Sequence, residues 1–312
     1  MLASLWIALP AAAADVPIVS FERAASSLRI VVGGEPVARY VFDDPVIPRP
    51  YFCDMVAPGG TPLTRHHPPR EGLDATDHAT FHPGIWMAFG DLSGADFWRN
   101  RARVLHRGFV AEPEGGAGQG SFAVRNDYVA DDKLLCHETC RINLGVRPER
   151  YLLVWDSEFR ADERDFYFGD QEEMGLGIRL ATPLTVAHGG EIVNSDGLRN
   201  EAGAWGNVAD WCSYSGTVGR DEIGVLLAPD PKNFRRSWFH VRDYGLLVAN
   251  PFGRHAFTGG ELSRITVKKG DSLRVRCALL LWRADAAQPL DKSAAAQECL
   301  ALPAENGLSA AH

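Results

Sequence analysis

The sequence lacks the long apolar run that a transmembrane helix needs, and it lacks the basic clusters that bind nucleic acids. A helix that crosses a bilayer takes about 20 consecutive apolar residues, and the apolar runs here are shorter. Lys and Arg number 32 against 40 Asp and Glu, which gives a net charge of −8. A nucleic-acid partner would require a basic surface. These absences exclude a transmembrane protein and a nucleic-acid partner, and they leave a small-molecule partner.

Motifs for nucleotide binding and for serine chemistry are also missing. The sequence contains no Walker loop, no dinucleotide glycine motif between a strand and a helix, and no serine nucleophile elbow. The glycine-rich segment 115–120 is expected to be a loop between strands, because no strand-to-helix context surrounds it. We therefore expect no nucleotide cofactor.

The N-terminus carries a targeting signature. Residues 1–14 are apolar and end in an Ala-rich stretch, although no Lys or Arg precedes the apolar run. We interpret them as a signal-peptide remnant, which predicts a periplasmic or secreted protein; a cytoplasmic extension is the alternative. In an exported chain some of the six cysteines could pair. Cys136 and Cys140 have a metal-like spacing but no second Cys/His pair in register, so no zinc site is assigned there.

Short apolar runs with a period of two dominate the chain. Leu28–Val32 and Val37–Phe42 flank a Gly-Gly turn and predict a β-hairpin. Ile265–Val267 and Leu273–Cys277 flank Lys-Lys-Gly-Asp and predict another. The aromatic and β-branched residues of such runs favour half-buried strands. The pattern predicts an all-β fold, a large antiparallel β-sandwich with few short helices.

No internal linker divides the chain, so residues 20–285 are expected to form a single β-sandwich catalytic domain. Residues 286–312 are expected to form a C-terminal helix and a tail, because Pro289–Leu302 is the best helical segment.

The most unusual segment is rich in histidine. His78 and His82 lie just before Trp86, and His66 and His67 lie upstream. Imidazole transfers protons near neutral pH and binds metals. This excess predicts one wall of an enzyme site.

Two further segments offer partners for these histidines. His240 and Arg242 alternate by two, so on a strand they face the same side. Glu172 and Glu173 face opposite sides of an extended chain, in a glycine-rich and turn-rich region.

Several motifs together resemble a known family, the one labelled "methane oxygenase PmoA", over roughly residues 30 to 280. The motifs are Asp77-His78 with His82-x-Gly84-x-Trp86, Glu173-x-Gly175-x-Gly177-x-Arg179, Trp211-x-x-Tyr214-x-Gly216, and His240-x-Arg242-x-Tyr244-Gly245 with Asn250-Pro251-Phe252-Gly253. One departure is Phe81-His82-Pro83, where relatives often carry two adjacent histidines. A role that needs both imidazoles is therefore in question for this chain.

The resemblance implies a sandwich of the kind found in aldose mutarotases and polysaccharide lyases, and a link to sugar catabolism. A methane monooxygenase subunit would be a membrane protein, and this chain lacks the helices for it. The family match also selects Glu173 over Glu172.

We therefore expect a carbohydrate-active enzyme that uses His/Glu acid–base chemistry on a small-molecule substrate. The first hypothesis is a lyase that performs β-elimination on a 3-keto glycoside or a related sugar derivative; an aldose epimerase (mutarotase) or a glycoside hydrolase is the alternative. The candidate catalytic residues are His78, His82, Glu173 and His240. The candidate substrate-binding residues are Arg179, Arg242, Tyr244, Asp210, Trp211, Tyr214, Trp98 and Asn250.

Two other hypotheses stay open. A divalent metal could be held by His78, His82, His240 and Glu173, because histidines with one carboxylate are a common ligand set. An exported, non-enzymatic carbohydrate-binding protein would explain the tryptophans but not the histidines. The sequence does not determine the oligomeric state.

Overall fold

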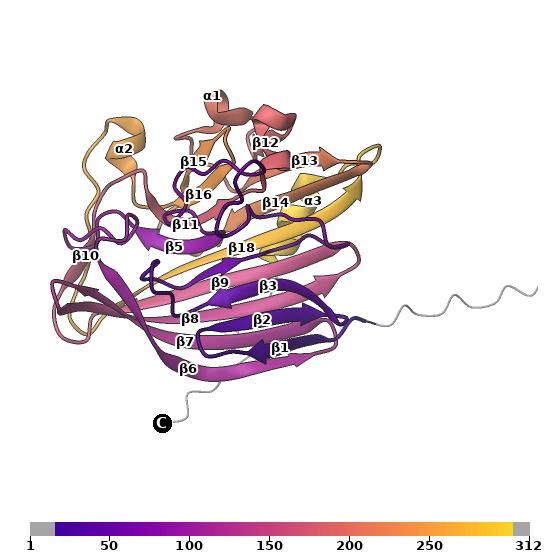
Figure 1. The fold of residues 1–312 in the computed structure, drawn as a ribbon. Coiled ribbons are helices and arrows are strands. Elements are labelled where there is room, and N and C mark those ends of the chain that lie inside the picture. The colour runs from indigo at the N-terminus through magenta and orange to yellow at the C-terminus, as the bar shows by residue number, and fades with distance from the viewer. Residues whose placement is uncertain (1–15, 302–312) are drawn as a thin grey trace, which may run out of the picture.

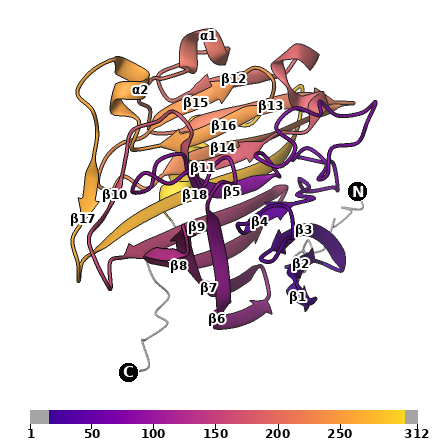
Figure 2. The same ribbon diagram turned by 60° about the vertical axis from the view of Figure 1, so that its left-hand side comes forward.

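The computed structural model describes residues 16–301 and shows two eight-stranded antiparallel sheets packed face to face (Figures 1 and 2). The predicted all-β sandwich is confirmed. The first sheet runs in the order β1 (Val19–Arg23), β2 (Ser27–Val32), β3 (Glu35–Val41), β4 (Tyr51–Cys53), β5 (Ile85–Phe89), β11 (Met174–Arg179), β16 (Leu246–Asn250) and β15 (Trp238–Arg242).

The second sheet is built mainly from longer strands. Its order is β12 (Glu191–Asn194), β13 (Cys212–Val218), β14 (Asp221–Pro229), β18 (Ser272–Asp285), β9 (Arg150–Arg160), β8 (Lys133–Arg147), β7 (Gln119–Ala130) and β6 (Arg103–Gly116). A small third sheet pairs β10 (Phe166–Phe168) with β17 (Ile265–Val267). The helices are short: α1 (Asn200–Ala204), α2 (Arg254–Thr258), α3 (Lys292–Leu300), and the 3₁₀ turns η1 (Thr182–Leu184) and η2 (Val186–His188).

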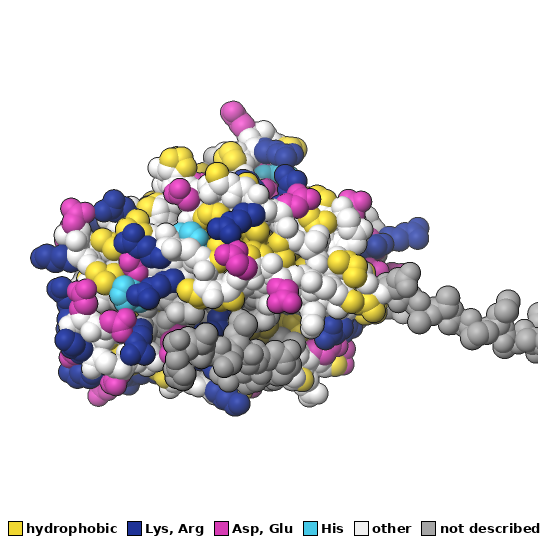
Figure 3. All heavy atoms as spheres, turned by 90° about the horizontal axis from the view of Figure 1, so that it is seen from below, with side chains coloured by type: hydrophobic (Ala, Val, Ile, Leu, Met, Phe, Trp, Pro, Cys, Tyr) yellow, Lys and Arg dark blue, Asp and Glu magenta, His cyan; other side chains and the backbone are white. Residues whose placement is uncertain are grey.

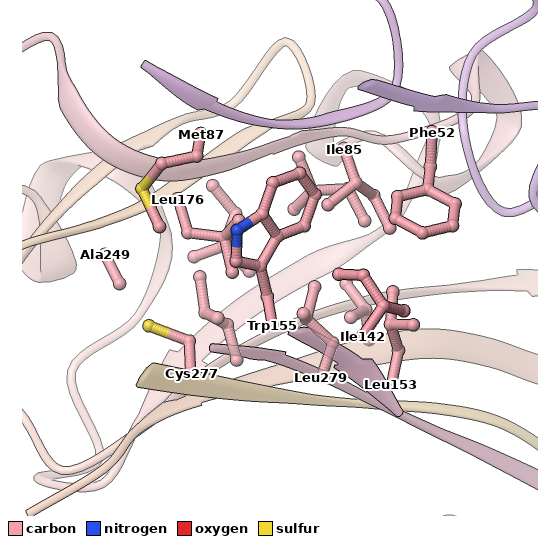
Figure 4. Packing of buried hydrophobic residues seen from close by; sticks show 14 of the residues in the cluster. Phe52, Ile85, Met87, Ile142, Leu153, Trp155, Leu176, Ala249, Cys277 and Leu279 are labelled. Carbon is pink, nitrogen blue, oxygen red and sulfur yellow. The ribbon is translucent and has the colours of Figure 1, made fainter. Parts of the chain in front are cut away.

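The core lies between the two large sheets. Ile85 and Met87 of the first sheet face Ile142, Trp155 and their neighbours on the second (Figure 4). Because side chains alternate along a strand, every second residue of β5 is left for the outer face of the first sheet. That outer face carries the candidate site.

Some of the local predictions from the sequence are confirmed, and others are wrong. The hairpin of β2 and β3 is confirmed. The predicted hairpin over residues 265–277 is wrong, because β17 pairs with β10 while β18 pairs with β14 and β9. Residues 115–120 are mostly strand rather than loop, since β6 and β7 continue through them to a tight turn. The terminal helix forms as α3, and residues 1–14 lie outside the described part.

Two general expectations can also be compared with the structure. No helix within residues 16–301 has the length and apolar character needed to span a bilayer. All six cysteines are buried and unpaired, so none of the disulfides considered for an exported chain forms. Acidic and basic side chains are interspersed on the face shown in Figure 3, with no single basic patch.

The core contains one buried acid. Glu138 of β8 accepts hydrogen bonds from Asn126 Nδ2 (2.8 Å) and from Ser157 Oγ. Burial raises the pKa of Glu138, and the hydrogen bonds from Ser157 and Asn126 only partly oppose this shift. The folded protein therefore binds the Glu138 proton more tightly than the unfolded chain does.

This shift predicts a pH dependence of stability. The contribution of Glu138 is fully present below the unfolded pKa of about 4.3 and is lost as the pH rises through the higher folded pKa. Between pH 4 and pH 7 we expect the free energy of unfolding to fall more steeply in the native protein than in Glu138→Gln. Urea unfolding at several pH values measures both slopes, and equal slopes would contradict the assignment.

Candidate active site

Four strands of the first sheet present the candidate site on their outer face. The register places Trp86, Gly177, Val248 and His240 in one row across β5, β11, β16 and β15. Directly opposed residues share a face, so Trp86 and His240 stand on the same side, with backbones roughly 14 Å apart. Arg242 lies two residues from His240 on β15 and shares this face, as its parity predicted.

A loop from the first third of the chain crosses this face; we call residues 66–83 the strap (Figure 2). His82 stacks on Trp86 with ring centroids 5.0 Å apart. His78 stacks on His82 at 4.8 Å, and Tyr244 stacks on His78 at 6.1 Å. The four rings form a column, so the structure brings together two predicted catalytic histidines and one predicted substrate-binding residue.

His78 is oriented by a carboxylate. Its Nδ1 lies 2.8 Å from Asp77 Oδ2, and Arg179 donates two hydrogen bonds to Asp77, at 2.8 and 2.9 Å. Arg65 adds a longer ion pair to Asp77 at 3.6 Å. An ionised carboxylate only accepts, so Nδ1 of His78 carries a proton, and in the neutral imidazole Nε2 then holds the lone pair. The His78 side chain is 43% exposed, which leaves this nitrogen free to act as a base.

The charge of Asp77 is firmly held. Burial raises the pKa of the Asp77 carboxyl, but hydrogen bonds from Arg179 and His78 outweigh burial and hold that pKa far below its usual range. His78 itself has φ of 50°, a left-handed conformation that costs energy in a non-glycine residue. Such strain is tolerated at functional sites where the surroundings impose it.

The other two histidines are buried and neutral. Burial lowers the pKa of His82 well below its ordinary value, and the positive charges of Arg179 and Arg65 lower it further. Burial lowers the pKa of His240 to about 4, although the nearby carboxylate of Glu172 opposes this. Neither imidazole therefore carries a charge at pH 7.

His240 is held in one orientation. Its Nδ1 donates to the Glu172 carbonyl oxygen at 3.0 Å, which leaves the Nε2 lone pair as an acceptor. Arg242 donates to Glu201 at 2.8 Å and to the Glu172 carboxylate at 3.3 Å. Asn250 donates to the carbonyls of Gln171 and Glu172 (2.7 and 3.1 Å). The predicted binding role of Asn250 is corrected to a positioning role, because its amide holds this loop in place.

Glu173 does not join the histidines. Its carboxylate forms an ion pair with Arg99, and its carbonyl accepts a hydrogen bond from the Gly90 amide at 2.9 Å. A carboxylate held by an arginine is a weak proton donor. The predicted catalytic role of Glu173 is therefore replaced by an ion pair at the edge of the site.

Two of the predicted aromatic residues, Trp98 and Tyr214, lie outside the ring column. Trp98 is fully buried and contacts His82 and Trp86 edge to face, at 5.8 and 5.3 Å. Tyr214 belongs to the inter-sheet core, and its hydroxyl donates to the Asp243 carbonyl at 2.8 Å beside Tyr244. It therefore positions the turn that carries Tyr244 instead of meeting a substrate.

Two predicted residues lie away from the cluster. Trp211 packs against the hydrophobic cluster beneath α3, on the outer side of the second sheet. Asp210 is exposed and pairs with Arg236 at 2.7 Å. Both expectations are corrected: each side chain belongs to a motif, but the chain turns it away from the ring column.

The predicted metal set does not assemble. Within residues 16–301, no three His, Cys, Asp or Glu side chains gather in a way that could hold a metal ion. His78 and His82 stack in parallel instead of directing their nitrogens to one point, and Glu173 is bound to Arg99.

Three arginine and aspartate residues of the site were not selected from the sequence. Asp77 lies next to His78 in the same motif, and an Asp-His pair was the available signal. Arg65 donates to the carbonyls of Ala75 and Asp77 (2.8 and 2.7 Å) and so fixes the strap. Arg49 donates to the Phe81 carbonyl at 2.6 Å. No local pattern reports these last two contacts, because they join distant segments.

Gly177 provides the space for Trp86. A Cβ at this position would lie 2.9 Å from Cζ2 of the Trp86 ring, which is fully buried and stacked on His82. Gly177→Ala is expected to displace the ring and to destabilise the protein by about 1–3 kcal/mol. Urea unfolding measures this. Gly145→Ala on β8 is the matched control, because its Cβ would meet nothing closer than 3.8 Å; equal losses would contradict the prediction.

The arrangement suits proton transfer near pH 7. His78 supplies an oriented base, Tyr244 supplies a hydroxyl beside it, and neutral His240 supplies an acceptor across the sheet. Burial raises the pKa of Tyr244, so its hydroxyl stays protonated.

Comparison with known proteins gives a family but no activity. Residues 27–296 match the model of a family of unknown function, DUF6807. This match does not show the methane oxygenase label that the resemblance carries. No curated protein matches the sequence.

Solved structures give only distant likenesses. The GH36 α-galactosidase AgaB from Geobacillus stearothermophilus is 10% identical with a TM-score of 0.45, over 86% of this chain and 41% of that one. A galactose mutarotase-like protein from Clostridium acetobutylicum is 9% identical with a TM-score of 0.39, over 87% of this chain and 99% of that one. The chain thus spans about two fifths of the α-galactosidase. Scores this low carry no inference about function.

Proposed function

Because the chain belongs to DUF6807, a family of unknown function, its activity has to be argued from the site, and we propose that it is a carbohydrate-active enzyme that removes a proton from its substrate. The observation that carries the proposal is the Asp77–His78 hydrogen bond, with Asp77 gripped by Arg179. This pair fixes the tautomer of His78 and presents Nε2 as the base. The ring column beside it offers aromatic faces and edges on which a sugar ring can pack.

The reaction we propose is β-elimination from a 3-keto glycoside. His78 Nε2 removes the C2 proton, which the ketone at C3 makes acidic. The electron pair of that C–H bond forms the C1–C2 double bond. The bond from C1 to the glycosidic oxygen breaks, and the leaving oxygen takes up a proton. In this proposal the Tyr244 hydroxyl and the positive charge of Arg179, whose guanidinium lies 4.4 Å above the Tyr244 ring, stabilise the negative charge that develops on the substrate.

The paired state of the carboxylates argues against a glycoside hydrolase. That chemistry uses two carboxyl groups, one of them an acid with a raised pKa. Here Asp77 pairs with Arg179, Glu172 with Arg242, and Glu173 with Arg99. The hydrogen bonds from Arg179 lower the pKa of Asp77, so Asp77 is not suited to donate a proton, and the carboxylates of Glu172 and Glu173 are also engaged by arginines.

Proton exchange and bond cleavage test the proposal together. Purified protein is incubated in D₂O with methyl 3-keto-β-D-glucoside and with methyl β-D-glucoside, and both are followed by proton NMR. We expect the C2 proton signal to disappear and methanol to be released from the keto sugar only. Exchange without release would indicate the epimerase alternative, and so would faster interconversion of the anomers in a separate incubation with α-D-glucose. If neither sugar changes, the chain is not this enzyme, and binding alone would favour the non-enzymatic alternative.

A further inference from the structure

Three rings of the site carry nitrogens without partners. Nδ1 of His82 and the Nε1 atoms of Trp86 and Trp98 are buried and make no hydrogen bond within residues 16–301. The three rings contact one another, with centroids 5.0 to 5.8 Å apart. An indole N–H only donates, and a buried donor without an acceptor costs roughly 1–3 kcal/mol. The two indole N–H groups therefore lack an acceptor, and the unpartnered Nδ1 of His82 lies in the same cluster.

Arg49 adds a further donor and a positive charge to the cluster. It is 3% exposed and bonds the carbonyls of Phe81, Phe97 and Trp98, at 2.6, 3.0 and 3.0 Å. Its Nε is also buried without a partner. The side-chain contact of Arg49 with Asn100 brings no negative charge. This guanidinium therefore lies against the ring cluster and has no carboxylate bonded to it within the described residues.

The charged side chains around His82 also favour the binding of an anion. Arg49, Arg65 and Arg179 are all buried, and Asp77 is the carboxylate that bonds Arg65 and Arg179. Uncompensated buried charge is costly unless a counter-charge arrives. Burial lowers the pKa of Arg49 to about 9, and burial together with neighbouring Arg179 lowers that of Arg65 to about 10. The Arg49 shift reflects burial alone, whereas the Arg65 shift also reflects the positive charge of Arg179; in both cases an anion beside the guanidinium would offset the cost of burying the charge.

We propose that Arg49, His82, Trp86 and Trp98 receive an anionic oxygen group of the substrate, and that the substrate is an acidic sugar carrying a carboxylate. The sugar part rests on the proposed function, whereas the anion site rests on these four side chains. A carboxylate suits them because one guanidinium matches its single charge and planar ring N–H groups match its oxygens. The four nitrogens are buried in this conformation, so the proposal requires the side chains around them to move apart when the anionic group binds.

The first test compares ligands of the same shape and different charge. Calorimetry measures binding of methyl β-D-glucuronide and methyl β-D-glucoside to the native protein. We expect the glucuronide to bind at least about tenfold more tightly, because charge-assisted hydrogen bonds are the stronger ones. Equal affinities would overturn the acidic-sugar inference, and deuterium exchange on the neutral keto sugar would then still stand for the proposed function. Tighter binding of glucose 6-phosphate than of the glucuronide would overturn the inference that the anionic group is a carboxylate.

The second test locates the site with variants. Trp98→Phe keeps a ring and removes an N–H, and Arg49→Met removes the charge; each is expected to abolish most of the preference. Trp282→Phe is the matched control, because Trp282 donates its N–H to Glu222 near α3, outside the cluster. A preference that survives both Trp98→Phe and Arg49→Met would overturn the assignment to this cluster. The native ligand comparison remains decisive if either variant fails to fold.

A third measurement separates the two proposals. Acetate is titrated alone, and tryptophan fluorescence is followed in the native protein and in Trp98→Phe. We expect a saturable change that Trp98→Phe loses and Trp282→Phe keeps. Acetate binding without any sugar binding would support the anion site and refute the carbohydrate function. No response to acetate, glucuronide or phosphate would refute the anion site.

Discussion

His78→Asn is expected to keep its fold and to lose between two and four orders of magnitude in turnover of the keto sugar. A positioned general base contributes about 10²–10⁴ to a rate, and the Nε2 lone pair of His78 is the base that the structure presents. The side chain is 43% exposed and half surrounded by rings, so its replacement is expected to change stability by less than about 1 kcal/mol. Methanol release and the urea midpoint are measured on the same preparation.

A second histidine of the strap gives the matched control. His66 also faces a carboxylate, with Nδ1 2.9 Å from Asp74, but it makes no ring contact with the column. His66→Asn is expected to keep nearly native turnover. If His66→Asn and His78→Asn lose the same amount, the column is not the catalytic centre. Full turnover in His78→Asn would show that His78 is not the general base.

The strand pairing could be predicted from the sequence where a strand pairs with its immediate neighbour in the chain. The alternating run from residue 28 to residue 42 predicted β2 and β3, because a Gly-Gly turn joins two strands that pair with each other. The run from residue 265 to residue 277 carries equally good turn residues, yet β17 pairs with β10 about a hundred residues earlier. Local periodicity specifies a strand but not its partner, and tertiary packing decided the second case.

The site was predictable to a similar extent. The parity of His240 and Arg242 predicted their common face, and the local excess of histidine pointed to the segment in which His78 and His82 stack. Trp211 belongs to the same set of motifs but turns beneath α3, so motif membership did not report which side of a sheet a residue faces. Arg179 and Asp77 are 102 positions apart in the sequence. Their hydrogen bonds form because β11 lies under the strap, and no local sequence pattern reports that arrangement.

Arg179→Met is expected to lower turnover by about 100-fold and to destabilise the protein by about 2 kcal/mol. Breaking a fully buried ion pair costs about 3–5 kcal/mol, and the cost is smaller here because Asp77 is 37% exposed and keeps Arg65 at 3.6 Å. Asp77 is then held by one cation instead of two, and His78 follows it. A displacement of about 1 Å at a base is sufficient for a 100-fold loss. Urea unfolding and steady-state kinetics measure the two effects.

An exposed pair separates this role from a general effect of losing an arginine. Arg39 also bonds one carboxylate, Asp54, through two nitrogens, at 2.9 and 3.1 Å, but both side chains lie on the surface. Arg39→Met is expected to cost less than about 1 kcal/mol and to leave turnover unchanged. A double-mutant cycle of Arg179→Met with Asp77→Asn then isolates the pair, and we expect the losses in turnover to be far from additive. Additive losses would mean that Arg179 acts on the substrate directly, through its guanidinium beside Tyr244, and not by positioning Asp77 and His78.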